Sequence, residues 1–200
     1  MKPRQVVLAS GNPGKLAELR RLVAEAGLGL EVLGLGDFEP YAEPAETERT
    51  FEGNARLKAQ AAAAHTGLPA IADDSGLAVD ELNDMPGVRS ARWAGPQRDD
   101  LANLELLLRQ LDGVPATRRG ARFVCALVLA TPDGHTRTWH GAMPGHINTA
   151  PVGENGFGYD PIFVPEGYEV TSAQLSASAK DAISHRGQAV RSFLAWLKED

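Results

Sequence analysis

The amino-acid sequence predicts an α/β fold built on a mixed sheet. Strand-like and helix-like segments alternate early in the chain, and two later apolar stretches are joined by TPDG at residues 131–134, a sequence typical of a hairpin turn. Alternation favours parallel strands with helical crossovers, whereas a hairpin adds antiparallel pairing, so both kinds should occur in one sheet. The expected strands are Gln5–Ala9, Leu30–Leu33, Ala70–Ala72, Ala121–Thr131 and Thr136–Gly141.

Four helices are expected, and the first has the clearest end signals. Asn12 can act as its N-cap, Pro13 suits the first helical position, and Gly27 ends the apolar stripe. The other expected helices are Thr50 to Gly67, the leucine-rich stretch DDLANLELLLRQLDG at residues 99–113, and one that carries Val190, Phe193, Leu194 and Leu197.

Composition and charge exclude several classes of protein. The chain has 200 residues with no repeat, low-complexity tract or linker, so we expect a single domain over residues 1–200. A net charge of −6 with scattered basic residues argues against nucleic-acid binding. No apolar run is long enough to span a membrane, no signal-peptide pattern is present, and the only cysteine, Cys125, sits in an apolar run. These features predict a cytoplasmic protein with no membrane partner.

The segment SGNPGK, between the first strand and the first helix, is a candidate phosphate site. It is not a Walker A loop, because Ala9 and Leu16 stand where that motif needs glycine and serine or threonine. Its glycines, the helix N-terminus and the lysine still suit an anion. The alternative is a capped helix start with a solvated lysine. The candidate residues are Ser10, Gly11, Asn12, Pro13, Gly14 and Lys15.

Two adjacent aspartates follow the expected strand at residues 70–72. We expect Asp73 and Asp74 to enter a turn closed by Ser75 and Gly76, with neighbouring side chains pointing apart, so that one faces a cleft and the other braces the backbone. Adjacent carboxylates need compensation, and Mg²⁺ prefers carboxylate and phosphate oxygens. The alternative is a pair of Asx turns.

The polar segment at residues 36–50 offers further carboxylates. Glu43, Glu46 and Glu48 precede the second helix, and any of them could be a second metal ligand or simply be solvated. On that helix Asn54 and Lys58 are four residues apart and share a face, which either points into a cleft or is structural.

Aromatic and cationic residues gather near the C-terminus. In GENGFGYDPIF, Phe157 can provide a stacking platform for a flat base, whereas Tyr159 is better explained as a core aromatic in a tight turn. Lys180, His185 and Arg186 place hydrogen-bond donors around a helix start. Ser178 with Asp181, or Ser184, can cap that helix.

Six motifs, SGNPGK, TFEGNA, LPAIADDSGLAVD, PGVRSARWAG, GFGYDPIF and KDAISHRGQA, occur in this order. Together they resemble the non-canonical purine nucleoside triphosphate pyrophosphatases, the inosine/xanthosine triphosphatase family. The resemblance implies a long twisted mixed β-sheet flanked by helices, with two lobes around a central cleft, and a homodimer. It also implies Mg²⁺-dependent hydrolysis of ITP, dITP or XTP to the monophosphate and pyrophosphate.

The resemblance also implies roles for particular residues. Ser10 to Lys15 would hold the triphosphate, and Lys15 would stabilise charge in catalysis. Asp74 would be general base and metal ligand, with Ser75 a substrate contact. Many members have Glu-Glu-Thr-Gly where this chain has Ala45-Glu46-Thr47-Glu48, and Glu46 is the expected second metal ligand. The expected purine-binding residues are Phe157, Gly158, Tyr159, Asp160, Lys180, His185 and Arg186.

Two other functions remain open from the residues alone. A relative with a similar fold could act on pyrimidine nucleotides, although the SHR and FGYDP segments match the purine pattern. A non-catalytic nucleotide-binding regulator is also possible, although Asp73, Asp74 and Lys15 are all present.

Overall fold

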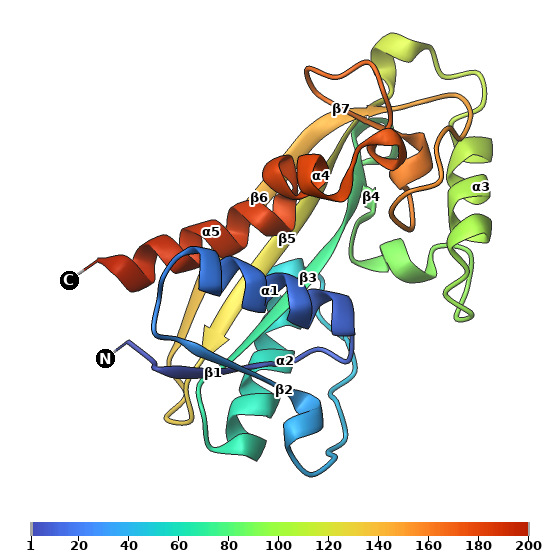
Figure 1. The fold of residues 1–200 in the computed structure, drawn as a ribbon. Helices are drawn as coiled ribbons and strands as arrows, with labels where there is room; N and C mark the ends of the chain where they lie inside the picture. Colours follow the sequence, from blue (N-terminus) through green and yellow to red (C-terminus); the bar gives the residue numbers. More distant parts are fainter. Residues whose placement is uncertain (1, 200) are drawn as a thin grey trace. The chain divides into compact units, whose positions relative to one another are not determined.

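The structure, a computed structural model, describes residues 2–199 and has the expected α/β organisation (Figure 1). Its helices are α1 (Pro13–Glu25), α2 (Phe51–Thr66), α3 (Asp100–Gln110), α4 (Ala177–Ile183) and α5 (His185–Lys198). Its strands are β1 (Gln5–Leu8), β2 (Glu31–Gly34), β3 (Ala70–Val79), β4 (Met85–Pro86), β5 (Gly120–Ala130), β6 (Thr136–Ile147) and β7 (Phe163–Pro165). None of the helices within this range is both long enough and apolar enough to cross a membrane.

The described strands form one mixed sheet, which confirms the predicted fold class. Their order is β2-β1-β3-β5-β6-β7, and β4 pairs with β3 outside this path. β1 pairs in parallel with β2 and β3, with Val6 opposite Val32 and Val7 opposite Ala70. The pairs β3–β4 and β6–β7 are antiparallel. Parallel pairing follows from the helical crossovers α1 and α2, as the alternating sequence pattern predicted.

The chain divides into two compact units. Unit 1 takes in the residues up to Asp74, residues 125–140 and the residues from Gln188 onward, and unit 2 takes in residues 75–124 and 141–187. Strands β3, β5 and β6 each contribute residues to both units.

In unit 1 the alternation of side chains along the strands separates two cores. Val6 and Ile71 pack with apolar residues of α1 and α5, whereas Val7, Ala70 and Ala72 pack against buried alanines of α2. Successive side chains of a strand point to opposite faces, so α1 and α5 cover one face here and α2 covers the other (Figure 1). This parity fixes where the side chains that follow Ala72 point.

Unit 2 has its own core around α3. Leu104, Leu107 and Leu111 pack against Leu77 of β3 and Phe163 of β7, all nearly or fully buried. The leucine spacing that predicted α3 is therefore the spacing that places one helical face in this core.

The predicted cap of the first helix is confirmed, because Asn12 accepts from the backbone N–H groups of Gly14 and Lys15. Thr50 and Asp99, the residues at which the next two helices were expected to start, cap α2 and α3. The predicted Ser178–Asp181 cap is wrong, because Ser178 lies within α4, and Ser176 accepts from Ala179 N–H at its start.

The alternative cap at the start of α5 is confirmed. Ser184 Oγ accepts from Gly187 N–H at 3.0 Å. Two separate caps are present because the segment forms two helices, α4 and α5, with Ser184 between them.

The predicted turn at Ser75 and Gly76 is wrong, because β3 continues without a break from Ala70 to Val79. Leu77 and Val79 are buried in unit 2, and Val79 pairs with Met85 of β4. Burial of this second apolar stretch and its backbone hydrogen bonds favour an extended chain over a turn.

Candidate functional site

The SGNPGK loop is held by hydrogen bonds of its own. Ser10 Oγ accepts from Asn12 N–H at 3.2 Å, and Asn12 Oδ1 accepts from Gly14 N–H at 2.8 Å and from Lys15 N–H at 3.3 Å. Gly11, Asn12, Pro13 and Gly14 are exposed. The loop is thus an ordered, accessible helix N-terminus, the kind of backbone site that favours an anion.

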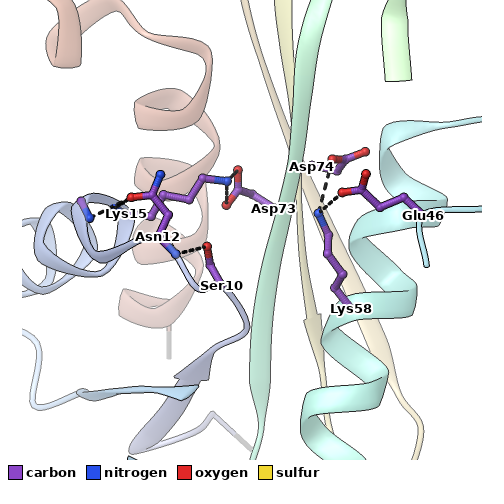
Figure 2. A network of polar contacts seen from close by, with 8 residues as sticks. Ser10, Asn12, Lys15, Glu46, Lys58, Asp73 and Asp74 are labelled. Carbon is purple, nitrogen blue, oxygen red and sulfur yellow. Dashed lines mark hydrogen bonds and ion pairs between the residues drawn. The ribbon is translucent and has the colours of Figure 1, made fainter. Parts of the chain in front are cut away.

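Lys15 forms a largely buried ion pair with Asp73. Its Nζ lies 3.0 and 2.8 Å from the two carboxylate oxygens, and the Asp73 side chain is 3% exposed (Figure 2). The alternative of a solvated lysine is therefore wrong. Asp73 follows Ala72, so strand parity directs it to the α1 face, where Lys15 lies in the first turn of the helix.

Asp74 points to the opposite face of β3, as predicted for adjacent strand residues (Figure 2). There its Oδ1 lies 3.3 Å from Lys58 Nζ, and Asn54 Nδ2 donates to its Oδ2 at 3.2 Å. Lys58 Nζ is also 3.3 Å from Glu46 Oε1. The shared helical face of Asn54 and Lys58 thus points at a carboxylate pair rather than at solvent.

Among the three glutamates of the preceding segment, Glu46 is the one whose contact with Lys58 places it near Asp74. Glu48 instead uses its backbone N–H, which donates to Asn54 Oδ1 at 2.9 Å. A Cβ at Gly53 would come within 2.6 Å of Glu48 Cβ, so the glycine in TFEGNA allows this segment to approach the start of α2.

The electrostatics of Asp74 suit cation binding. Burial raises the pKa of the Asp74 carboxyl, Lys58 lowers that pKa, and the nearby charge of Glu46 raises it again. Two half-buried carboxylates thus share one ammonium group. Over residues 2–199, no cluster of three or more acidic, histidine or cysteine side chains is arranged to hold a metal. The two carboxylates of Asp74 and Glu46 fit a hard cation such as Mg²⁺, which commonly takes one or two carboxylates and completes its shell with substrate phosphates and water.

In unit 2 the glycine-rich segment presents Phe157, whose side chain is 66% exposed. Asp160 lies beneath this segment. Its Oδ2 accepts from Phe157 N–H at 2.8 Å and pairs closely with Lys180, whose Nζ is 5.1 Å from the Phe157 ring centre. Gly156 has a φ of +80°, and a Cβ there would clash with the Asp160 carboxylate. These contacts hold the backbone that carries an exposed aromatic ring beside a cation.

The remaining predicted residues of unit 2 differ in their surroundings. Tyr159 is buried, and its hydroxyl donates to the backbone oxygen of Ser90 at 2.9 Å, which supports the core alternative for this side chain. Burial and the charge of Asp100 raise the Tyr159 pKa, so the phenol stays neutral. His185 stacks on Phe123, with ring centres 5.1 Å apart.

Arg186 is half-buried in the first turn of α5, and Ser75 is half-buried in the middle of β3. Asp100, which sequence reasoning missed, accepts from Gly158 N–H at 2.9 Å. Its position in the first turn of α3 carried no signal, because acidic residues are common there.

The chain is thus an α/β protein in which the loop before α1 suits an anion and two adjacent carboxylates lie on β3. The chain belongs to the Ham1 family, whose model matches residues 6–196. A dITP/XTP pyrophosphatase of Nocardia farcinica is 57% identical over 198 residues, which cover 98% of this chain and 96% of the relative. This finding confirms the family to which the sequence motifs pointed.

Two solved structures are also similar to this chain in sequence and fold. The nucleoside-triphosphatase / dITP/XTP pyrophosphatase of Mycobacterium abscessus is 51% identical, with a TM-score of 0.82 over 97% of this chain and 100% of that one. A HAM1 protein from Coxiella burnetii is 40% identical, with a TM-score of 0.92 over 98% of this chain and 99% of that one. The mixed α/β fold is thus shared along nearly the whole length.

Proposed function

We propose that this chain hydrolyses the non-canonical purine nucleoside triphosphates dITP, ITP and XTP to the monophosphate and pyrophosphate. Relatives described as dITP/XTP pyrophosphatases, 57% and 51% identical over nearly the whole chain, support the activity. The observation that carries it to this chain is that Asp74 of β3 and Glu46 of the segment before α2 both pair with Lys58. Asp73, the residue before Asp74, pairs with Lys15 of the loop.

Residues of unit 1 are assigned to the triphosphate. Asp74 and Glu46 would hold Mg²⁺, which when bound offsets phosphate charge and lowers the pKa of bound water. Asp74 is assigned as the base that accepts the proton of the attacking water. Lys15 and the loop from Ser10 to Gly14 bind the phosphates and stabilise charge that develops on the departing pyrophosphate.

Residues of unit 2 are assigned to the purine. Phe157 stacks on the base, and Lys180, His185 and Arg186 donate hydrogen bonds to its edge. Hypoxanthine and xanthine carry a carbonyl at C6, whereas adenine carries an amino group, which would leave such donors without an acceptor. Sites built on hydrogen bonds can reject a mispaired analogue by up to roughly 10⁴–10⁵-fold. Asp160 acts here mainly by fixing Lys180 and the Phe157 backbone.

The proposal is tested by pyrophosphate release from dITP, ITP, XTP, ATP, GTP and dTTP, each with Mg²⁺ and with chelator. We expect rapid release from the first three with Mg²⁺ and none with chelator. Preferential release from dTTP would favour the pyrimidine-acting alternative. Nucleotide binding without release from any substrate would favour the non-catalytic regulator.

Replacing Phe157 with alanine is expected to raise KM for dITP by about 5–150-fold, because base–aromatic stacking is worth about 1–3 kcal/mol. The unfolding midpoint should change little, since the ring is exposed. Steady-state kinetics with dITP and ATP measure the effect. Tyr168→Ala, a change at another exposed aromatic of unit 2, is the matched control. An unchanged KM in Phe157→Ala would contradict the stacking role.

The Asp74 carboxyl should titrate above its ordinary pKa in the metal-free protein, because burial raises that pKa. Added Mg²⁺ should lower the Asp74 pKa, since cation and proton compete for the same oxygens, and Mg²⁺ affinity should fall as the pH drops through this raised pKa. Carboxyl ¹³C NMR titration of the wild type, with Asp74→Asn for assignment, measures both effects. A pKa that Mg²⁺ leaves unmoved would remove Asp74 from the metal site.

A cytoplasmic homodimer is the assembly and location we assign. The homodimer follows from the family resemblance of the sequence motifs, and the location is supported by a substrate drawn from the free nucleotide pool. Sedimentation equilibrium checks the assembly, and a mass equal to 21.3 kDa at micromolar concentration would contradict the dimer.

A further inference from the structure

Asn54 is a fully buried polar side chain in the first turn of α2. Its neighbours on this helix, Ala55, Ala59 and Ala62, are also buried and pack in an apolar core of unit 1. A buried amide costs free energy unless its donors and acceptors are paired, so an asparagine in this environment requires specific partners.

The partners of Asn54 come from two different segments. Its Oδ1 accepts from Glu48 N–H at 2.9 Å, and its Nδ2 donates to Asp74 Oδ2 at 3.2 Å. A backbone N–H can only donate, so the atom facing Glu48 must be the amide oxygen, and the amide nitrogen must then face Asp74. The orientation of the amide is therefore determined by the chain itself.

We propose that Asn54 is a positioning residue for the hydrolytic reaction, which sets Asp74 and the Glu46 segment in register with each other. The inference rests on the proposed function. By engaging Asp74 Oδ2, the amide leaves Oδ1 on the side of Lys58. By accepting from Glu48 N–H, it anchors the backbone two residues after Glu46. A single side chain thus couples the two carboxylates assigned to the cation.

Two substitutions separate the two contacts. In Asn54→Asp a carboxylate oxygen can still accept from Glu48 N–H, but the donor to Asp74 is lost and a negative charge faces it. In Asn54→Leu both contacts are lost while the number and branching of the side-chain heavy atoms are kept. Asn103→Leu is the matched control, because Asn103 of α3 is 2% exposed and its amide likewise makes two hydrogen bonds, here both to backbone groups, donating to Ala91 O at 3.2 Å and accepting from Ala94 N–H.

We expect kcat for dITP to fall about 10–150-fold in both Asn54 variants, with KM changed by less than about threefold, because hydrogen bonds to charged groups are worth about 1.5–3 kcal/mol. Asn103→Leu should lose stability but keep kcat. Hydrogen exchange of the Glu48 amide supplies a readout independent of activity. It should accelerate in Asn54→Leu and remain slow in Asn54→Asp.

The outcomes separate this inference from the proposed function. A wild-type protein that does not hydrolyse dITP overturns the proposed function. An active wild type with Asn54→Asp at wild-type kcat overturns the positioning role alone, as does an Asn103→Leu variant that loses kcat equally. If Asn54→Leu does not fold, kcat and Glu48 exchange in Asn54→Asp decide the question.

Discussion

Replacing Asp74 with asparagine is expected to lower kcat for dITP by at least about 10²-fold, within the 10²–10⁴-fold range of general bases. Asparagine is nearly isosteric, but it cannot accept the proton of water and is a weaker ligand for Mg²⁺. Nucleotide affinity should be largely retained, since the phosphate and base contacts are assigned to other residues. Fixed-time assays of pyrophosphate release measure kcat, and calorimetric titration measures nucleotide affinity separately.

The matched control for this variant is Asp84→Asn, which removes an exposed carboxylate paired with Arg122 in unit 2. Exposed ion pairs contribute about 0–1 kcal/mol, so this control should be active and stable. Near-normal turnover by Asp74→Asn would remove Asp74 from the role of base. Equal losses of kcat and affinity would indicate that Asp74 binds substrate instead.

Replacing Lys15 with methionine should destabilise the protein by about 3–5 kcal/mol and also abolish most activity, because it removes the ammonium partner of a buried carboxylate. Asp73 is only 3% exposed and lies 2.8 Å from Lys15 Nζ. Its charge would remain in an environment that disfavours it. Urea unfolding monitored by tryptophan fluorescence measures the loss.

The double variant Lys15→Met/Asp73→Leu distinguishes stability from catalysis. Buried ion pairs can be replaced by apolar side chains at little cost, so the double variant should recover most of the stability lost by Lys15→Met. Its activity should stay low, because no ammonium group remains at the loop. A double variant less stable than Lys15→Met would contradict the ion-pair argument, and recovered activity would remove Lys15 from the phosphate site.

Much of this arrangement could be predicted because its signals are local. Asn12, Pro13, Thr50 and Gly67 mark helix ends through contacts within a few residues, and the structure confirms each of them. The expectation that Asp73 and Asp74 point apart needed only the two-residue period of an extended chain.

The continuation of β3 could not be predicted because its causes are distant. Aspartate and glycine are depleted in strands, so ADDSG favoured a turn locally. The compensating ammonium groups come from Lys15, 58 residues from Asp73, and Lys58, 16 residues from Asp74. Tertiary pairing of this kind overrides local propensity.

Short strands and buried polar contacts were missed for a related reason. β4 has two residues and β7 has three, too few for a periodic pattern. Asp160 was expected at the purine edge, and the sequence held no sign that its carboxylate accepts from Phe157 N–H beneath a glycine-rich segment.

The central claim is that this chain cleaves a purine triphosphate between the monophosphate and pyrophosphate, and ³¹P NMR of the products tests it most directly. With Mg²⁺ and dITP, the claim requires dIMP and pyrophosphate to appear together in equal amounts. It also requires no dIDP to accumulate and Asp74→Asn to show neither product at the wild-type rate. Appearance of dIDP with orthophosphate, or of no product at all from the wild type, would contradict it.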